Sequence, residues 1–336
     1  MAHSYDSVYR KRRSQGPSQR AQQHSTRRRG RQCLRLVLDD AWRTPDLKPF
    51  LQGGPLCARL ITTRNEGVLP LDVPCVPVDA MKPEEAVQLL YTGIGSPEDL
   101  KQYEQAFYEL VQRLKEWPLL LALANGILRN RIKRHQQTIP DALIYLNHAL
   151  DKRGLVAFDP SRSQERHDAV ARTLEVSFAL LDGTDYARYL RLAIFPEDAL
   201  IPLDVIHRSW LTVEEFDATD AEDICLGLHE LSLLRSYDLT KHYARLHDVV
   251  RGYLRIKAGS TLPTFQQQFL DTYSVSRWAD LPFSEDYLWK YLIPHLIETQ
   301  QSQSLLKTIT DLRYLAKKVS VQHSAYAAEA DIELAE

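Results

Sequence analysis

Apolar residues between positions 34 and 78 fall in short continuous runs, which predict buried strands rather than amphipathic helices. The runs cover 34–38, 58–62 and 73–78. No tight hairpin turn joins the first two, so we expect these strands to pair in parallel. Two prolines, Pro74 and Pro77, predict that the third strand is short or lies at an edge. With one helical turn at most near 46–51, the segment 33–80 is typical of the last part of a parallel α/β sheet.

From Lys82 onward the apolar spacing is helical. Proline or acidic residues mark helix starts at Lys82-Pro83, Ser96-Pro97 and Trp117-Pro118, and another helix is predicted over 141–151. We therefore expect a helical subdomain over 81–157. The polar stretch 158–166 is interpreted as a linker.

The next block predicts helices followed by a β-hairpin. Helices are expected over 168–182, 184–194, 203–210 and 220–234, and short strands over 235–239 and 242–246. This order is typical of a winged helix, which we place at 165–257. Residues 261–336 predict a helical arm with aromatic anchors such as Phe265, Trp278, Tyr287, Trp289 and Tyr291. The predicted fold class is thus mixed and mainly α: a partial parallel α/β sheet followed by a helical subdomain, a winged helix and a helical arm.

The charge is unevenly distributed. The formal net charge is −2, yet residues 1–32 hold nine Lys and Arg against one acid, which leaves 33 basic and 43 acidic residues for the rest. This tail is rich in Ser and Gln and poor in aliphatic residues, so we expect it to be disordered. A basic tail is also able to bind nucleic acid. The expected recognition helix, 221–230, is acidic and opposes that interpretation.

The composition also indicates in which cellular compartment we expect the protein. No apolar run is long enough to span a bilayer, and because no apolar segment follows the basic N-terminus we do not expect it to be a secretory signal. The four cysteines, Cys33, Cys57, Cys75 and Cys225, are scattered without C-x-x-C spacing. We expect reduced cysteines in a cytoplasmic protein without membrane partners.

The strongest chemical signal is the acidic pair that ends the first run, Asp39 and Asp40. Side chains just past the carboxyl ends of parallel strands face the ligand crevice, and paired carboxylates suit a magnesium ion and an attacking water. Thr62-Thr63-Arg64 ends the second run, so Arg64 is expected in the same crevice, where a guanidinium can sense a terminal phosphate. The alternatives are an acidic turn and a surface arginine.

Two further motifs have both a structural and a functional interpretation. Trp117-Pro118 either starts a helix or packs on an adenine base. Leu246-His247-Asp248 lies between a predicted strand and a predicted helix, where Asp248 is expected to cap the helix and His247 either faces solvent or donates to a phosphate. A phosphate-cradling loop requires Gly-x-x-x-x-Gly-Lys-Ser/Thr, and no Gly-Lys pair occurs in these 336 residues.

The order of these motifs resembles the NB-ARC module of STAND signalling NTPases, which include plant disease-resistance proteins, the animal apoptotic protease-activating factor and bacterial regulators. The resemblance covers 33–256. Matching segments are the Walker B strand (34–42), the sensor-1 strand (61–65), the entry to the first helical subdomain (78–91), the Gly-Leu-Pro-Leu position (116–119), the Leu-x-x-Phe-Pro motif (190–196) and the MHD motif (246–248), which has Leu for Met.

The resemblance implies a role for each matching residue. Asp39 would order the magnesium water and bind the metal, Asp40 would act near the γ-phosphate, and Thr63 and Arg64 would form the sensor. Two further roles follow from the later motifs: Pro118 would contact adenine, and His247 would hold the β-phosphate of ADP.

The resemblance also implies ADP or ATP with magnesium in the intact module, and self-association through the nucleotide-binding module. Because the Walker A motif is missing, we expect an N-terminally truncated module with weak or no nucleotide binding and no turnover, so enzymatic activity is left open. Sensor repeats and an effector domain would lie beyond this chain, and the sequence does not identify the ligand sensed. The alternatives are a winged-helix DNA-binding regulator with a basic arm and a non-catalytic interaction scaffold.

Overall fold

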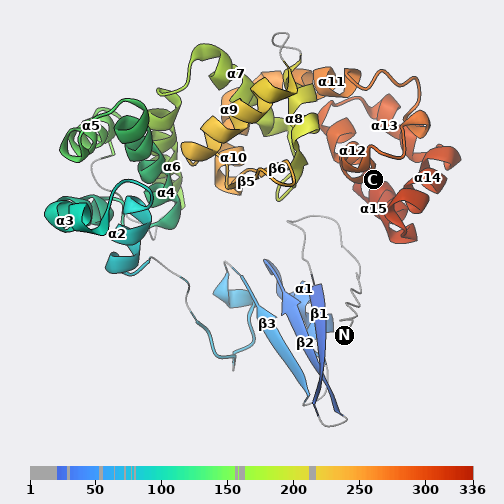
Figure 1. Cartoon of the computed structure of the whole chain (residues 1–336). Coiled ribbons are helices and arrows are strands. Elements are labelled where there is room, and N and C mark those ends of the chain that lie inside the picture. The colour runs from blue at the N-terminus through green and yellow to red at the C-terminus, as the bar shows by residue number, and fades with distance from the viewer. Residues whose placement is uncertain are drawn as a thin grey trace. The chain divides into compact units, whose positions relative to one another are not determined.

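The computed structural model describes residues 21–28, 31–52, 56–63, 65–71, 73–76, 78, 81–155, 158, 163–211 and 217–335. Within these ranges the chain is mainly helical, as predicted, and has two small sheets (Figure 1). The chain divides into two compact units, residues 1–78 with 323–334 and residues 79–322. No helix within the described ranges is long and apolar enough to cross a membrane.

A three-stranded sheet of order β1-β2-β3 forms the centre of the first unit. β1 (Ala21–Arg28) runs antiparallel to β2 (Arg31–Leu38), which runs parallel to β3 (Cys57–Ile61). The β2–β3 pairing confirms the predicted parallel strands. α1 (Thr44–Leu51) follows β2, and a 3₁₀ turn (Glu66–Val68) follows β3. The buried side chains of this unit are Leu36, Leu38, Ala41, Leu47 and Val68.

Two features of this sheet correct the sequence analysis. The expectation that 1–32 is disordered is wrong for 21–28, because backbone pairing from Ala21↔Leu38 to Arg28↔Arg31 forms a strand that has no apolar pattern of its own. The strand predicted over 73–78 is absent from its described residues, 73–76 and 78. Pro74 removes a donor that a ladder needs. β1 therefore covers one edge of β2, and β3 is an edge strand of the described sheet.

The second unit begins with helices at the predicted starts. α2 (Pro83–Tyr91), α3 (Pro97–Arg113) and α4 (Pro118–Arg129) all begin at proline, whose missing N–H costs nothing in the first turn. A π-helical turn (Asn130–Arg134) separates α4 from α5 (Ile139–Lys152). The backbone N–H of Asp141 donates to the Thr138 hydroxyl, which caps α5.

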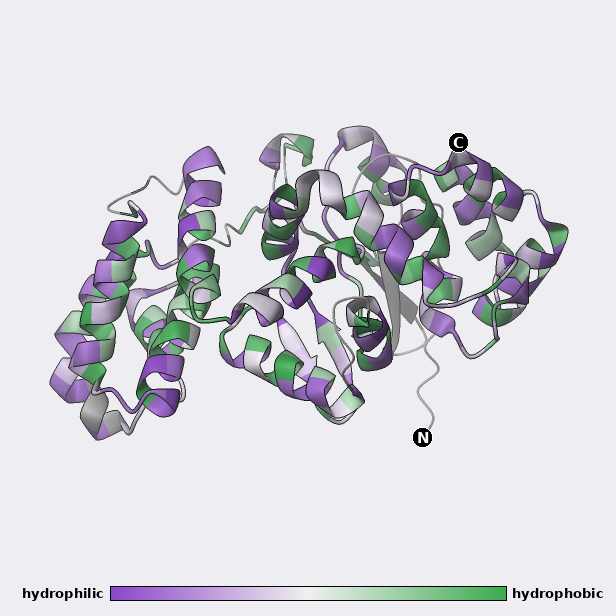
Figure 2. Ribbon diagram, turned by 90° about the horizontal axis from the view of Figure 1, so that it is seen from above, coloured by the Kyte–Doolittle hydropathy of each residue, from purple (hydrophilic) through white to green (hydrophobic). Residues whose placement is uncertain are grey.

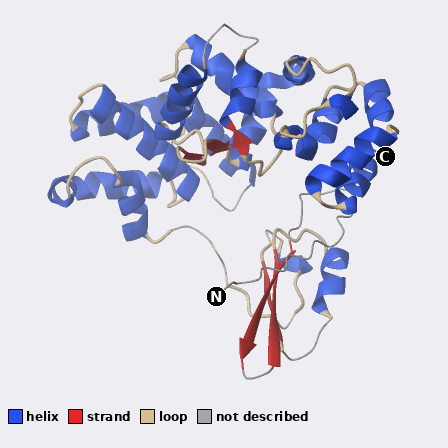
Figure 3. Ribbon diagram, turned by 45° about the vertical axis from the view of Figure 1, so that its right-hand side comes forward, coloured by secondary structure: helices blue, strands red, loops and turns tan. Residues whose placement is uncertain are grey.

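The segment predicted as a winged helix contains the expected helices and hairpin. It comprises α6 (Ser163–Phe178), α7 (Gly183–Arg191), a 3₁₀ turn (Leu192–Ile194), β4 (Ile201–Pro202), α8 (Leu203–Trp210), α9 (Ala218–Glu230), β5 (Ser236–Asp238), β6 (Tyr243–Arg245) and α10 (Asp248–Ala258). β5 and β6 pair antiparallel, as predicted, and β4 adds a short strand on the other side of β6 (Figure 3). The linker expected over 158–166 is shorter than predicted, because α6 already begins at Ser163.

Helices of the predicted arm complete the chain. They are α11 (Leu262–Asp271), α12 (Asp286–Glu298), α13 (Ser302–Ile309), α14 (Leu312–Gln322) and α15 (Ala325–Ala335), with 3₁₀ turns at Gly259–Thr261 and Trp278–Asp280. Two of the predicted aromatic anchors, Tyr287 and Trp289, are buried, and Trp289 stacks on Tyr314 with ring centroids 5.6 Å apart.

One hydrophobic core runs through the second unit. Its buried members come from the helical subdomain, the winged-helix segment and the arm, for example Leu120, Tyr189, Trp210, Leu254 and Trp289. Hydrophobic and hydrophilic positions alternate along these helices in Figure 2, as amphipathic helices require. The predicted subdomains therefore share one core instead of each enclosing its own.

Candidate functional site

The acidic pair and the threonine pair meet at the carboxyl edge of the parallel strands. β2 and β3 end in register at Leu38 and Ile61. The N–H of Thr62 donates to the carbonyl oxygen of Leu38 at 2.9 Å, and the N–H of Ala41 donates to the carbonyl oxygen of Thr62 at 2.9 Å. Asp39, Asp40, Thr62 and Thr63 are thus neighbours, whereas the strand-end argument named Arg64 as the partner of the acidic pair. Arg64 lies outside the described residues.

Hydrogen bonds orient these side chains. The Thr62 hydroxyl donates to Oδ1 of Asp39 at 2.5 Å and accepts from the N–H of Asp40 at 2.8 Å. The indole Nε1–H of Trp42 donates to Oδ2 of Asp40 at 3.0 Å. The Thr63 hydroxyl donates to the carbonyl oxygen of Ala41 at 2.6 Å and accepts from the N–H of Asn65 at 3.0 Å. Thr63 therefore holds the two strand-end loops together.

These residues fit a magnesium ion better than a nucleotide phosphate chain. Asp39 is exposed and Asp40 half-buried, and carboxylate oxygens are hard ligands that Mg²⁺ accepts one or two at a time, together with waters and phosphates. No group of three or more His, Cys, Asp or Glu side chains able to hold a metal occurs in the described part of the chain. Two carboxylates are sufficient for this ion, but the backbone cradle for phosphates has no counterpart in the sequence.

Pro118 and His247 both lie in the second unit. Pro118 is the first residue of α4, with the half-buried Trp117 as its N-cap, so this motif starts a helix, and its contact with adenine stays a prediction. His247 is half-buried and precedes α10 directly. Leu246 is buried, as predicted.

The predicted cap of α10 is wrong. His247 has extended φ and ψ angles and occupies the N-cap position, without a side-chain capping bond, while Asp248 is the first helical residue. An acid in the first turn still interacts favourably with the helix dipole.

Two residues that orient the acidic pair were not singled out from the sequence. Thr62 bonds to both acids, and Trp42 bonds to Asp40. The available signal was position alone: Thr62 follows β3 as Asp39 follows β2, so their side chains are neighbours across the strand pair.

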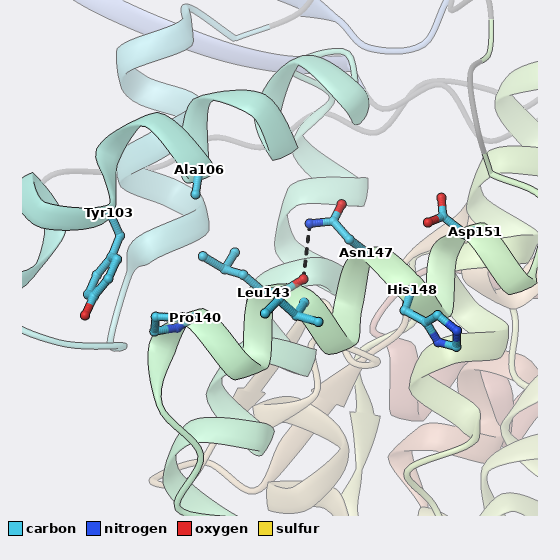
Figure 4. Close-up of a pocket in the computed structure, with 8 residues that line it drawn as sticks. Tyr103, Ala106, Pro140, Leu143, Asn147, His148 and Asp151 are labelled. Atoms are coloured by element: carbon cyan, nitrogen blue, oxygen red, sulfur yellow. Dashed lines mark hydrogen bonds between the residues drawn. The ribbon is translucent and has the colours of Figure 1, made fainter.

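A shallow hollow of about 430 Å³ lies between α3 and α5 and contains none of the predicted site residues (Figure 4). Tyr103, Leu143 and the 67% exposed Ile144 make it largely apolar. The amide of Asn147 at its rim donates to the carbonyl oxygen of Leu143 within α5. The side chains that line this hollow do not form a recognisable catalytic or metal-binding group.

Two further expectations concern the cysteines, which we expected to be reduced, and the helix that would contact DNA in the winged-helix alternative. Cys57, Cys75 and Cys225 are free, and burial raises the pKa of the Cys225 thiol to about 12, which makes it unreactive. α9 carries Asp220, Glu222 and Asp223, which oppose contact with a phosphate backbone.

Comparison with known proteins gives distant relatives. No family model matches the chain. Regulatory protein AfsR of Streptomyces coelicolor is 29% identical over 232 residues, which cover 69% of this chain and 22% of that protein. Regulatory protein AfsR of Streptomyces griseus is 28% identical over 228 residues, or 67% of this chain and 21% of that protein. Disease resistance protein ADR1 of Arabidopsis thaliana is 25% identical over 203 residues, or 59% of this chain and 24% of that protein.

The chain is thus distantly similar, over roughly 60–70% of its length, to bacterial regulatory proteins and plant disease-resistance proteins. These are two of the groups whose nucleotide-binding module the motif order resembles. The chain spans about a quarter or less of the length of these relatives.

Proposed function

We propose that this chain carries part of an ADP/ATP-controlled signal-transduction switch of the NB-ARC type. The supporting observation is the carboxyl edge of β2 and β3, where Asp39 and Asp40 lie beside Thr62 and Thr63. The distant similarity to regulatory and disease-resistance proteins points in the same direction. Each distant relative alone is weak support, but the order of the motifs, the site geometry and the similarity agree with one another.

In this proposal each residue acts through its own chemistry. Asp39 binds Mg²⁺ and orders its water, and Asp40 acts near the γ-phosphate. Thr63 and Arg64 sense the terminal phosphate, Pro118 contacts adenine, and His247 donates to the β-phosphate of ADP. A bound magnesium ion would supply charge neutralisation to the phosphates. Self-association of the switch through its nucleotide-binding unit is part of the same proposal.

These 336 residues should bind nucleotide weakly and should not turn it over. Backbone N–H groups of a glycine-rich loop and a lysine supply much of the affinity for phosphates, and the sequence contains no such motif. We expect dissociation constants for ADP and ATP on the order of a millimolar or weaker.

Calorimetric titration of the chain with ADP and with ATP, each with Mg²⁺, tests this. Asp40→Asn should abolish the residual binding, whereas the matched control Asp46→Asn, on α1 and paired with Arg43 at 3.0 Å, should not. Micromolar affinity, or steady hydrolysis that Asp40→Asn removes, would contradict the expected weak binding. Absence of any nucleotide binding would favour the alternative of a non-catalytic interaction scaffold.

A further inference from the structure

Thr62 connects the two acids through a single oxygen atom. Its hydroxyl donates to Oδ1 of Asp39 at 2.5 Å while accepting from the N–H of Asp40 at 2.8 Å. A hydroxyl has one proton and two lone pairs, so both bonds form at once. The Thr62 side chain, just past the end of β3, therefore fixes the Asp39 carboxylate and the Asp40 amide, just past the end of β2.

The backbone of Asp40 needs such support. Its φ is 55°, in the left-handed region, which costs a non-glycine residue roughly 1 kcal/mol or more. The bond to Thr62 holds its amide, and the Trp42 indole holds its carboxylate at 3.0 Å. On its far side, the N–H of Ala41 donates to the carbonyl oxygen of Thr62 at 2.9 Å. Thr62 thus supplies a side-chain bond and a backbone bond that hold the turn at Asp40 and Ala41.

We infer that Thr62 is a positioning residue for the acidic pair: it sets the angle at which Asp39 and Asp40 present their carboxylates to a divalent cation. This inference rests on the proposed function for the identity of the cation. It assigns a separate task to Thr62, since the bonds of Thr63 to described residues are to backbone groups. A valine has the shape of threonine but neither donates nor accepts, so Thr62→Val removes both bonds and Thr62→Ser keeps them.

Amide hydrogen exchange tests the geometry without any ligand. In Thr62→Val the Asp40 amide should exchange about tenfold faster, the factor that a hydrogen bond of ordinary net strength provides. Thr62→Ser should retain protection. The control Thr92→Val removes an exposed hydroxyl that bonds within its own helix and should leave Asp40 unchanged. Unchanged protection of Asp40 in Thr62→Val would overturn the inference.

Mn²⁺ alone, followed by electron paramagnetic resonance of the free ion, tests the consequence. Thr62→Val should weaken Mn²⁺ binding about tenfold, as loss of a residue that orients a metal ligand does, and Thr62→Ser should restore it. Equal affinity of Thr62→Val and the wild type would overturn the positioning role. If the wild-type chain binds Mn²⁺ no better than Asp39→Asn, the proposed metal site fails, while the exchange experiment still decides the role of Thr62 in orienting the pair.

Discussion

Gly126 in α4 lies directly against the backbone of Leu231, the C-cap residue of α9. A Cβ built on Gly126 would come 2.4 Å from the carbonyl carbon of Leu231 and 2.5 Å from its oxygen. These atoms belong to the backbone and are unable to rotate away. The helical subdomain and the winged-helix segment therefore touch backbone to backbone at this point, which only glycine permits.

Gly126→Ala should destabilise the chain in spite of the better helix propensity of alanine. Relief of the clash requires α4 and α9 to shift, and overpacking of this kind typically costs about 1–3 kcal/mol. The matched control is Gly227→Ala in α9, where an added Cβ meets nothing within 4 Å and should stabilise by roughly 0.5–1 kcal/mol. Urea unfolding followed by circular dichroism measures both. A Gly126→Ala variant as stable as the wild type would show that the contact is loose.

Acid should destabilise the arm through His295. Its Nδ1 lies 2.5 Å from Oε1 of Gln266 and its Nε2 lies 2.9 Å from the Tyr287 hydroxyl. The Gln266 amide is oriented because its Nε2 donates to the carbonyl oxygen of Ile194. Nδ1 therefore carries the proton and Nε2 accepts one, so the ring is neutral. Burial, and secondarily the charge of Arg251, lowers the pKa of His295 to about 3.

The depressed pKa of His295 determines how the free energy of unfolding changes with pH. Between an ordinary value of about 6.5 and a folded value of about 3, the unfolded chain binds a proton that the folded chain does not. This contribution is complete above pH 6.5 and falls by up to about 1.4 kcal/mol per pH unit on acidification. His295→Gln should be less stable at pH 7 but should lose less stability between pH 6.5 and 4. His148→Gln, at an exposed position, should keep the wild-type slope, and an equal slope in His295→Gln would refute the assignment.

Glu175 of α6 links three elements through one carboxylate. Oε2 accepts from Arg153 at 2.7 Å, and Oε1 accepts from Tyr253 and Lys257 of α10, each at 3.1 Å. Burial tends to raise the pKa of Glu175, but the bonds from Lys257, Tyr253 and Arg153 outweigh it and the net shift is downward. Glu175→Gln should lower the free energy of unfolding, by less than about 1 kcal/mol because the group is a third exposed.

The dependence on salt concentration tests whether the effect of Glu175→Gln is electrostatic. The difference between wild type and Glu175→Gln should shrink in 1 M NaCl, since the Debye length falls to about 3 Å. Asp168→Asn on the same helix, where the carboxylate accepts a hydrogen bond from the neutral amide of Gln164, should change little at either salt concentration. A Glu175→Gln effect that is independent of salt would assign the loss to packing instead of charge.

Leu60 should promote association of the chain. It is 61% exposed on β3, an edge strand of the first sheet, and an exposed apolar residue on an open edge favours pairing with another chain. Leu60→Lys should lower the apparent mass in light scattering at tens of micromolar. Leu239→Lys in the second unit, at a residue 50% exposed, should not. A wild-type chain that is already monodisperse and monomeric would contradict this prediction.

Local signals made the helices predictable. Prolines at 83, 97 and 118 place three helix starts, because the first turn tolerates proline regardless of the rest of the fold. The parallel pairing of 34–38 with 58–62 was predictable because no tight turn joins the two runs, and its register places the residues after both strands side by side. These predictions required only neighbouring residues or one strand pair.

Features that depend on a distant partner were not predictable. β1 has no apolar alternation and forms because β2 offers an edge. We expected Asp248 to be the N-cap of α10, but the extended backbone angles of His247 place the N-cap one residue earlier. The contact of Gly126 with Leu231 joins two helices far apart in the sequence, and a lone glycine in a helix gives no sign of its partner.

The two hydrophobic cores differ greatly in size, and this sets an order of melting. Five buried apolar side chains hold the described part of the first sheet, whereas the core of the second unit extends from α2 to α14. Little buried apolar area means a low free energy of local opening. On warming, the acidic edge should be lost first, while the helical body persists as one cooperative block. The chain would then retain its helical signal in circular dichroism at temperatures where its candidate chemistry has already gone.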